Sequence, residues 1–345
     1  MRREATKPSV RSIAEHLGLS AATVSLALNG RRPTSFVSAD TRKQVWAAAK
    51  EMGYPIDRLR SQRPLLERVA VFMTAGPNPV FSETALVLCR DLSQHRVQVL
   101  THLTRTHREA HVAARDLQRK QEIDAAVFIG SREEILATEF PTVFVGEVPQ
   151  GASVWQVRAD NEGGGRSAGE YLWSLGHRSV AVVMPERRNP AGDLRISGLR
   201  TYWEERGATL PEERVLRLDI PTASDSHLRE LIGEFLVRDR KTADPATALF
   251  CFNDWVAGKI LKVLHGQGLH VPEEMSVVGF DDSIYAELLD PPLTSVTNPF
   301  DTLGALAAAL LLEQAESPNA EPRVVVAPCR LIGRQSCAPP GTRPE

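Results

Sequence analysis

The sequence lacks the long hydrophobic runs and the cysteine patterns that mark membrane, secreted and zinc-stabilised proteins. No run among its 345 residues approaches the roughly 18 to 20 apolar residues that span a bilayer, and the polar N-terminus has no apolar signal core. Its cysteines, Cys89, Cys251, Cys329 and Cys337, form no C-x-x-C pair and no Cys/His cluster. We therefore expect a cytoplasmic protein with reduced thiols, without a disulfide framework, a metal site or contact with a membrane.

Sequence signals of catalysis are weak. Residues 163–169 (GGGRSAG) open a helix after a strand, as a phosphate loop does, but they lack the Gly-Lys-Ser/Thr ending and a complete G-x-G-x-x-G. His177, within Gly-His-Arg, fits a structural role better than that of a catalytic base. We therefore expect that the protein is not an enzyme and needs no cofactor.

Net charge is small, but it is unevenly distributed. The chain has 41 Lys and Arg against 43 Asp and Glu, a net charge of −2. Residues 1–68 carry 13 basic and 6 acidic side chains, a net charge of +7, which leaves −9 for the remainder. This asymmetry indicates contact with a polyanion at one end of the chain, although a basic segment by itself is commonly only a solvated surface.

After residue 68, apolar runs of strand length alternate with segments of helical period. The strand candidates are residues 69–73, 97–100, 125–129, 143–145, 153–157, 180–184, 215–218, 248–252 and 276–280. Consecutively apolar strands joined by helices predict parallel sheets covered on both faces. So many strands exceed one small doubly wound unit, and residues 158–161 look like a crossover into a second sheet. We predict an α/β body of two doubly wound parallel-sheet lobes.

The N-terminal segment predicts an all-α helix-turn-helix head. Residues 8–52 read as three short helices, with Ser9 and Ser20 as N-caps and Gly18 as a helix end. At 100° per residue, the second helix places Thr23, Val24, Ala27 and Leu28 on an apolar face and Ala21, Ala22, Ser25, Leu26 and Asn29 on a face of small and polar residues. A face without long charged side chains suits close approach to the major groove of DNA.

Several motifs point to a known family. Residues 8–14 (PSVRSIA), 19–30 (LSAATVSLALNG) and 53–54 (GY) resemble the DNA-binding head of the lactose/galactose repressor family. The likeness continues in the body at residues 160–164 (DNEGG), 175–178 (LGHR), 195–199 (RISGL), 276–282 (SVVGFDD) and 292–296 (PLTSV). It covers about residues 7 to 338.

The resemblance implies an organisation and a function. It implies a helix-turn-helix domain at 1–54, a hinge at 55–68, and a periplasmic-binding-protein-like body at 69–338 that binds an effector and dimerises; we expect the tail, 339–345, to be disordered. The implied protein is a transcriptional repressor whose homodimer binds a pseudo-palindromic DNA operator. A small-molecule effector, a sugar or sugar derivative, would act from the cleft between the lobes.

The DNA-binding residues follow from the head motif and its helix geometry. They are Ser9, Arg11, Ser20, Ala21, Ala22, Thr23, Ser25, Leu26 and Asn29, with Leu59 as the candidate minor-groove wedge. Short polar side chains at helix starts also serve as ordinary caps, so capping remains the alternative.

The effector-binding candidates come from the body motifs. They are Asn78, Phe81, Asp160, Arg195, Asn253, Trp255 and Asp281, of which Arg195 is expected to open a helix and Asp281 to end a strand. Carboxylates and a guanidinium suit the hydroxyls of a sugar or the edge of a polar heterocycle. Salt bridges or caps that join the lobes are the alternative, with Asp254 as a natural N-cap. Phe81 and Trp255 could equally be packing residues.

The sequence departs from the family pattern at three places. The loop 31–37 is longer than usual, the hinge is shorter, and Leu26 stands where the family commonly has arginine. Two other functions remain open: a solute-binding protein, which the absent signal peptide and the head disfavour, and an enzyme acting on a sugar or nucleotide, which predicts turnover.

Overall fold

The computed structural model describes residues 8–29, 37–54, 65–74, 80–132, 134–219 and 224–341. The chain divides into two compact units, Met1–Leu65 and Leu66–Glu345. Within these described ranges, none of the helices is both long enough and apolar enough to cross a membrane.

The first unit is a three-helix domain with its own small core. Its helices are α1 (Val10–Leu17), α2 (Ala21–Asn29) and α3 (Ala39–Glu51). Ser9, Ser20 and Ser38 cap them, each side chain accepting from a backbone N–H three residues later. Gly18 ends α1 with φ 66°, a left-handed conformation that glycine adopts without steric cost. Ile13, Val24, Ala27, Val45 and Ala49 are fully buried and hold the helices together.

The second unit consists of two α/β lobes, each built on a six-stranded sheet in the described part of the chain. The sheet of lobe 1 has the order β11-β5-β4-β3-β1-β2. Its strands are β1 (Arg68–Thr74), β2 (Gln98–Thr104), β3 (Ala125–Ile129), β4 (Thr142–Val145), β5 (Trp155–Ala159) and β11 (Val324–Ala327). Its helices are α5 (Val80–Gln94), α6 (His107–Arg119) and α12 (Phe300–Glu316).

The sheet of lobe 2 has the order β12-β10-β9-β8-β6-β7. Its strands are β6 (Val180–Pro185), β7 (Val215–Leu218), β8 (Ala248–Cys251), β9 (Ser276–Asp281), β10 (Thr294–Thr297) and β12 (Leu331–Ile332). Its helices are α7 (Asn161–Ser174), α8 (Pro190–Glu204), α9 (Asp225–Asp239), α10 (Asp254–Gly266) and α11 (Ile284–Leu288), with a short 3₁₀ turn, η1 (Glu212–Arg214). Only β12 pairs antiparallel among the strands described.

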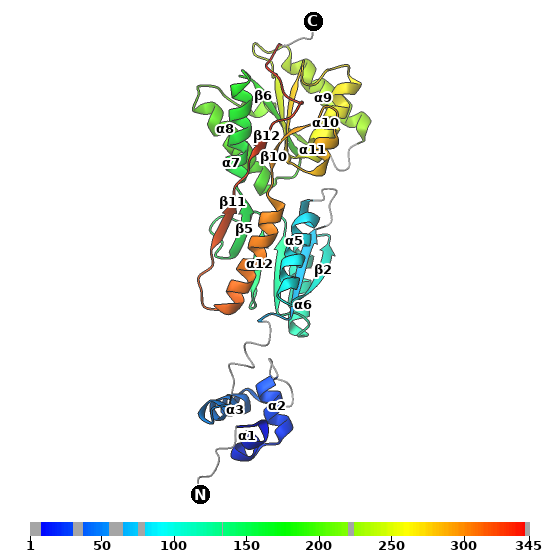
Figure 1. Cartoon of the computed structure of the whole chain (residues 1–345). Coiled ribbons are helices and arrows are strands. Elements are labelled where there is room, and N and C mark those ends of the chain that lie inside the picture. The colour runs from blue at the N-terminus through cyan, green and yellow to red at the C-terminus, as the bar shows by residue number, and fades with distance from the viewer. Residues whose placement is uncertain are drawn as a thin grey trace. The chain divides into compact units, whose positions relative to one another are not determined.

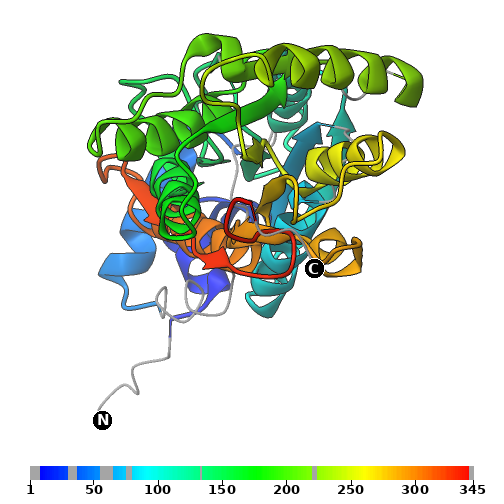
Figure 2. The same cartoon turned by 90° about the horizontal axis from the view of Figure 1, so that it is seen from above.

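Alternate side chains of each central strand enter different cores. In lobe 2, Val180 and Val182 pack with α7 and α8, whereas Ala181 and Val183 pack with α9 and α10. Figures 1 and 2 show these helix pairs on opposite faces of the sheet. The two doubly wound parallel-sheet lobes expected from the apolar runs are therefore confirmed.

The chain crosses between the lobes three times. After β5 it enters lobe 2 at α7, after β10 it returns to lobe 1 with α12 and β11, and it ends in lobe 2 at β12 (Figure 1). The sequence indicated only the first crossing. At the end of the described chain, the backbone of Ala338 exchanges hydrogen bonds with the hydroxyl of Ser276 and accepts one from buried His177, which gives that histidine a structural role.

Glycines allow α7 and α8 to pack backbone against backbone. A Cβ atom at Gly165 would lie 1.9 Å from the carbonyl oxygen of Arg195, and one at Gly198 would lie 1.9 Å from that of Glu162. Residues 165–169 also match the pattern G-x-S-x-G of a nucleophile elbow, which places its serine at a strand-to-helix turn. Here Ser167 lies inside α7, and its hydroxyl donates to the carbonyl of Gly163 at 3.0 Å. The glycine-rich segment is thus a helix-packing surface.

Candidate functional site

The second helix of the head exposes the face that the helical wheel indicated. Ala22 and Leu26 are exposed, Leu26 at 43% of its surface, while Val24, Ala27 and Leu28 are buried. Ser20 and Thr23 share a hydrogen bond of 2.8 Å between their hydroxyls at the start of α2. Arg11 lies on the surface of α1, 3.5 Å from Glu15.

Three predicted contacts cannot be placed from the structure. Leu59 and Asn78 lie outside the described residues, and so does the side chain of Asn29. The DNA contacts of the other head residues stay a prediction.

The effector candidates of the body converge on a cavity of about 260 Å³ between the two lobes. Phe81, Arg195, Asn253, Trp255 and Asp281 all line it. They come from four separate elements, α5, α8, the start of α10 and the end of β9, which the doubly wound fold brings together at the carboxyl edges of its strands. Ile129, Val145, Phe300 and Leu303 supply apolar wall from lobe 1.

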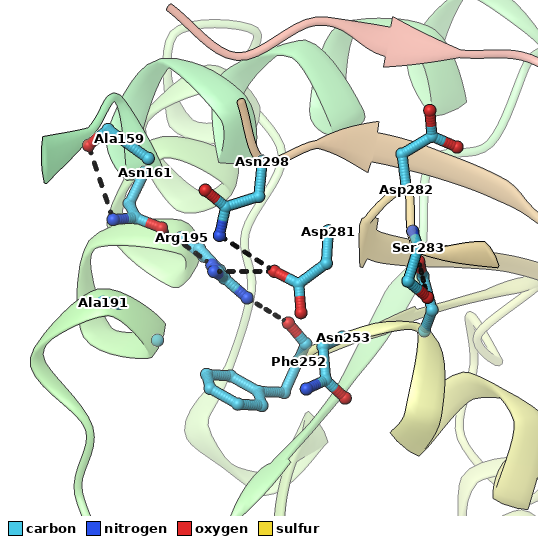
Figure 3. Close-up of polar contacts among 12 residues, drawn as sticks. Ala159, Asn161, Ala191, Arg195, Phe252, Asn253, Asp281, Asp282, Ser283 and Asn298 are labelled. Carbon is cyan, nitrogen blue, oxygen red and sulfur yellow. Dashed lines mark hydrogen bonds and ion pairs between the residues drawn. The ribbon is translucent and has the colours of Figure 1, made fainter. Parts of the chain in front are cut away.

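Arg195 is the centre of the polar network in this cavity (Figure 3). Its Nε–H donates to Oδ1 of Asn161 at 2.9 Å, one Nη to the carbonyl of Phe252 at 2.5 Å, and the other lies 3.4 Å from Oδ1 of Asp281. The guanidinium also lies 3.6 Å from the ring centroid of Phe280. Arg195 and Asp281 are each 4% exposed, so their charges interact with little screening by water.

The sequence suggested that Arg195 opens a helix, but the structure contradicts this position. Arg195 lies in the second turn of α8, where the close contact with Gly165 of α7 brings its guanidinium towards Asn161. Asp281 ends β9 with φ 101°, a strained conformation for a residue with a side chain. Asn298, which follows β10, donates to Asp281 at 3.1 Å.

Helix capping, the alternative role for these polar residues, applies to two of the effector candidates. Asp160 is the N-cap of α7, accepting from Gly163 N–H at 3.0 Å, and it is not among the residues that line the cavity. The cap of α10 is Asn253, which accepts from Val256 N–H at 3.0 Å, and not Asp254. Asn253 therefore has a capping role in addition to its place in the cavity wall.

Asp254 lies buried directly behind the cavity wall. Its carboxylate accepts hydrogen bonds from the backbone and hydroxyl of Ser283 at 2.6 and 3.0 Å and from the hydroxyl of Ser295. Burial first, and then the charge of Asp281, raise the pKa of Asp254 to about 7, against the opposing effect of these hydrogen bonds. This carboxyl group therefore titrates near neutral pH.

Sequence reasoning missed Asn161, Asn298, Asn189 and Phe252 as members of the cavity wall. A signal for three of them was present, because Asn161, Phe252 and Asn298 each come shortly after a strand of a parallel sheet, and such strand ends converge on the ligand crevice. Asn161 directly follows Asp160, the residue chosen instead.

Comparison with known proteins gives matches over both units. The profile "Bacterial regulatory proteins, lacI family" matches residues 9–55, and the profile "Periplasmic binding protein-like domain" matches residues 170–337. The regulator CelR of Thermobifida fusca is 30% identical over 349 residues, 96% of this chain and 98% of that one. The regulator DegA of Bacillus subtilis is 25% identical over 348 residues, 97% of this chain and all of the other.

Solved structures share the same fold. The "transcriptional regulator CelR-cellobiose complex" superposes with a TM-score of 0.69 and 28% identity, over 95% of this chain and 99% of that one. The lac repressor dimer bound to operator and an anti-inducer superposes with a TM-score of 0.68 at 22% identity, over 96% of this chain and all of that one. These named relatives are transcriptional regulators and not enzymes.

Proposed function

Because the chain belongs to the LacI family of bacterial regulatory proteins and is a transcriptional regulator, we propose that it is a repressor whose homodimer binds a pseudo-palindromic operator and responds to a sugar-like effector. The observation that carries this proposal is the cavity at Arg195 and Asp281, which both lobes line, in a chain that also has a helix-turn-helix head.

The head supports binding in the major groove. The exposed face of α2 consists of small residues and Leu26, so the helix can approach base edges closely. The starts of α1 and α2, next to Ser9 and Ser20, present backbone N–H groups that bind phosphates well. In this proposal Ala21, Ala22, Ser25, Leu26 and Asn29 face the groove, Arg11 and Thr23 contact the backbone, and Leu59 is the minor-groove wedge.

The cavity supports binding of a polyhydroxylated ligand. Asp281 supplies acceptors, Arg195 supplies forked donors, and Asn161, Asn253 and Asn298 supply amides that do both. Phe81 and Trp255 supply aromatic faces for the apolar side of a sugar ring. That CelR, a relative of 28% identity, has been crystallised with cellobiose supports the choice of a sugar.

The connections between lobes support control by the effector. Three chain crossings join the lobes, and the ligand would contact both at once. A ligand that binds one relative angle of the lobes better than another shifts the population towards that angle. This shift would change how the two heads of a dimer are held on DNA.

Exposed apolar side chains support a dimer. In the described chain Leu86 of α5, Leu103 of the edge strand β2, and Ile284 and Leu288 of α11 are each at least 65% exposed. These exposed apolar side chains are available for burial in an interface between two copies of the chain.

Removing the head tests the proposal. A chain of residues 66–345 should remain folded, dimeric and able to bind its effector, but should lose specific affinity for the operator that the full chain selects from random DNA. A thermal-shift screen of sugars on both forms identifies the effector, because a ligand of the folded state raises its apparent stability. Retained operator affinity of the truncated chain, or conversion of the bound sugar to a product, would contradict the proposal.

A further inference from the structure

A second cavity, of about 480 Å³, adjoins the proposed effector cavity and shares Ser131 and Asn189 with it. Lobe 1 lines it with the first turns of α6 and the segment after β3, and lobe 2 with the segment before α8. Among the described residues, its charged lining comprises four arginines, Arg108, Arg132, Arg187 and Arg188, against one carboxylate, Glu134. Of these arginines, Arg188 also pairs with Asp193 of α8 at 3.2 Å. Lobe 2 adds the positive end of the 15-residue helix α8.

Arg132 is a buried cation without a counter-ion in the described chain. It is 2% exposed, its Nε donates only to the carbonyl of Gly130 at 3.3 Å, and one Nη atom has no hydrogen-bond partner. No carboxylate of a described residue lies within ion-pair distance of it. The rings of Phe128 and Phe144, at 5.1 and 5.3 Å, are its neighbours.

Burying such a cation is costly unless a partner compensates. Burial lowers the pKa of Arg132 to about 10, so the guanidinium still carries its charge at neutral pH. An unpaired charge away from water is strongly unfavourable, and cation–π contact compensates for only part of the lost hydration. An anion in the adjoining cavity would supply the missing partner.

A buried histidine beside Arg132, His111, also lacks partners for its polar atoms. His111 is 1% exposed, stacks on Phe128 at 4.3 Å, and has no hydrogen bond at either ring nitrogen. Burial and the charge of Arg132 lower the pKa of His107 and of His111 to about 4. Both imidazoles are therefore neutral at pH 7, and each can donate one N–H to an anion.

We propose that this second cavity is an anion subsite, in which Arg132 binds a carboxylate or phosphate group of the effector whose hydroxylated part lies beside Arg195. The proposal rests on the proposed function for its sugar-like ligand. Arg187 and Arg188 approach the anion from lobe 2, so the same group would bridge the lobes. The effector is accordingly a sugar acid or a sugar phosphate and not a neutral sugar.

Inorganic phosphate and matched sugars test the subsite in the full chain. At constant ionic strength, replacing chloride by phosphate should raise the melting temperature, and glucuronate or glucose 6-phosphate should stabilise more than glucose. The relative effect of these two sugars distinguishes carboxylate from phosphate recognition. Arg132→Gln should weaken phosphate binding by about tenfold or more, as expected for the loss of a charged hydrogen bond. Equal effects of chloride and phosphate, and of charged and neutral sugars, would overturn the proposal.

Surface variants keep the test decisive where Arg132→Gln fails to fold. Arg187 is exposed, so Arg187→Gln should fold normally and weaken phosphate binding by about three- to tenfold. Arg115→Gln, which removes an exposed arginine of α6 outside this cavity, is the matched control and should bind phosphate as the wild type does. Equal losses in the two variants would indicate a general charge effect and would overturn the subsite.

Histidine titration gives a readout that a purely structural Arg132 would not produce. Phosphate bound beside His107 and His111 should raise the pKa of both imidazoles in an NMR titration, while His95, which lies outside the cavity, should not respond. The rival partner is Glu133, which lies outside the described residues. If Glu133→Gln destabilises the protein and phosphate leaves these pKa values unchanged, the proposal is wrong.

The two proposals fail separately. Operator binding with release by a neutral sugar, but without any response to phosphate, would retain the proposed function and refute the anion subsite. Phosphate binding that depends on Arg132 in a protein without operator affinity would support the anion subsite and refute the proposed function.

Discussion

Removing the charge of Arg195 should destabilise the protein and weaken effector binding together. In Arg195→Met the side chain keeps most of its length but loses its bonds to Asn161, Phe252 and Asp281. Asp281, 4% exposed, would then remain a buried carboxylate without its guanidinium partner, still accepting from the side chain of Asn298. Breaking one partner of a buried ion pair costs about 3 to 5 kcal/mol, a large part of the 5 to 15 kcal/mol of typical stability.

A double-mutant cycle tests this value. Urea unfolding should show that Arg195→Met with Asp281→Asn is less destabilising than the sum of the single changes, because removing both charges leaves neither one unpaired. Tryptophan fluorescence follows the unfolding, since four of the five tryptophans belong to residues 66–345. Effector affinity in calorimetry should fall by about 1.5 to 3 kcal/mol in Arg195→Met, the size of a lost charged hydrogen bond.

The control lies on the same helix. Arg200 pairs with Glu212 at 3.1 Å, but these side chains are 36% and 69% exposed, so Arg200→Met should cost less than about 1 kcal/mol. If Arg195→Met unfolds at the same urea concentration as Arg200→Met, or if the two single changes simply add, the inferred burial and coupling of the pair are wrong.

Three further predictions address the head, the helix packing and pH. Leu26→Arg should gain about 1 to 3 kcal/mol of discrimination in favour of guanine at the facing base pair, and identical base preferences for both proteins in operator selection at fixed salt would place residue 26 away from the bases. Gly165→Ala should cost more than about 3 kcal/mol of stability in urea unfolding, because its Cβ atom would overlap a backbone oxygen. The control Gly266→Ala, whose Cβ atom would have no neighbour closer than 3.5 Å, should be neutral or slightly stabilising. Similar effects of the two changes would contradict the contact between α7 and α8. Because Asp254 has a pKa raised to about 7 from an ordinary 3.8, the folded state binds its proton more tightly, and this group should lower the free energy of unfolding as pH rises from about 4 to 7. Urea unfolding of the wild type and of Asp254→Asn across this pH range should show the decline only in the wild type. Parallel pH profiles of the free energy of unfolding would refute the raised pKa of Asp254.

The sequence by itself determined the local elements and their exposed faces. Ser9, Gly18 and Ser20 delimit the head helices because capping depends on residues within one turn. The periodicity of α2 separated buried Val24 and Ala27 from exposed Leu26, since the helical repeat alone sets that division. Apolar runs likewise marked β1 to β9, because a strand buried on both faces is apolar at consecutive positions, but β10, β11 and β12 were not predicted.

Only the tertiary structure decided which polar residues meet. Asn161, Arg195, Asp281 and Asn298 are far apart in the chain, and the three crossings between lobes bring them into one network. It also decided that Asp160 caps a helix while its neighbour Asn161 faces the cavity, and that Arg132 is buried without a described counter-ion. Burial and pairing of a charge depend on segments that pack around it from elsewhere in the chain, so no local pattern could have specified them.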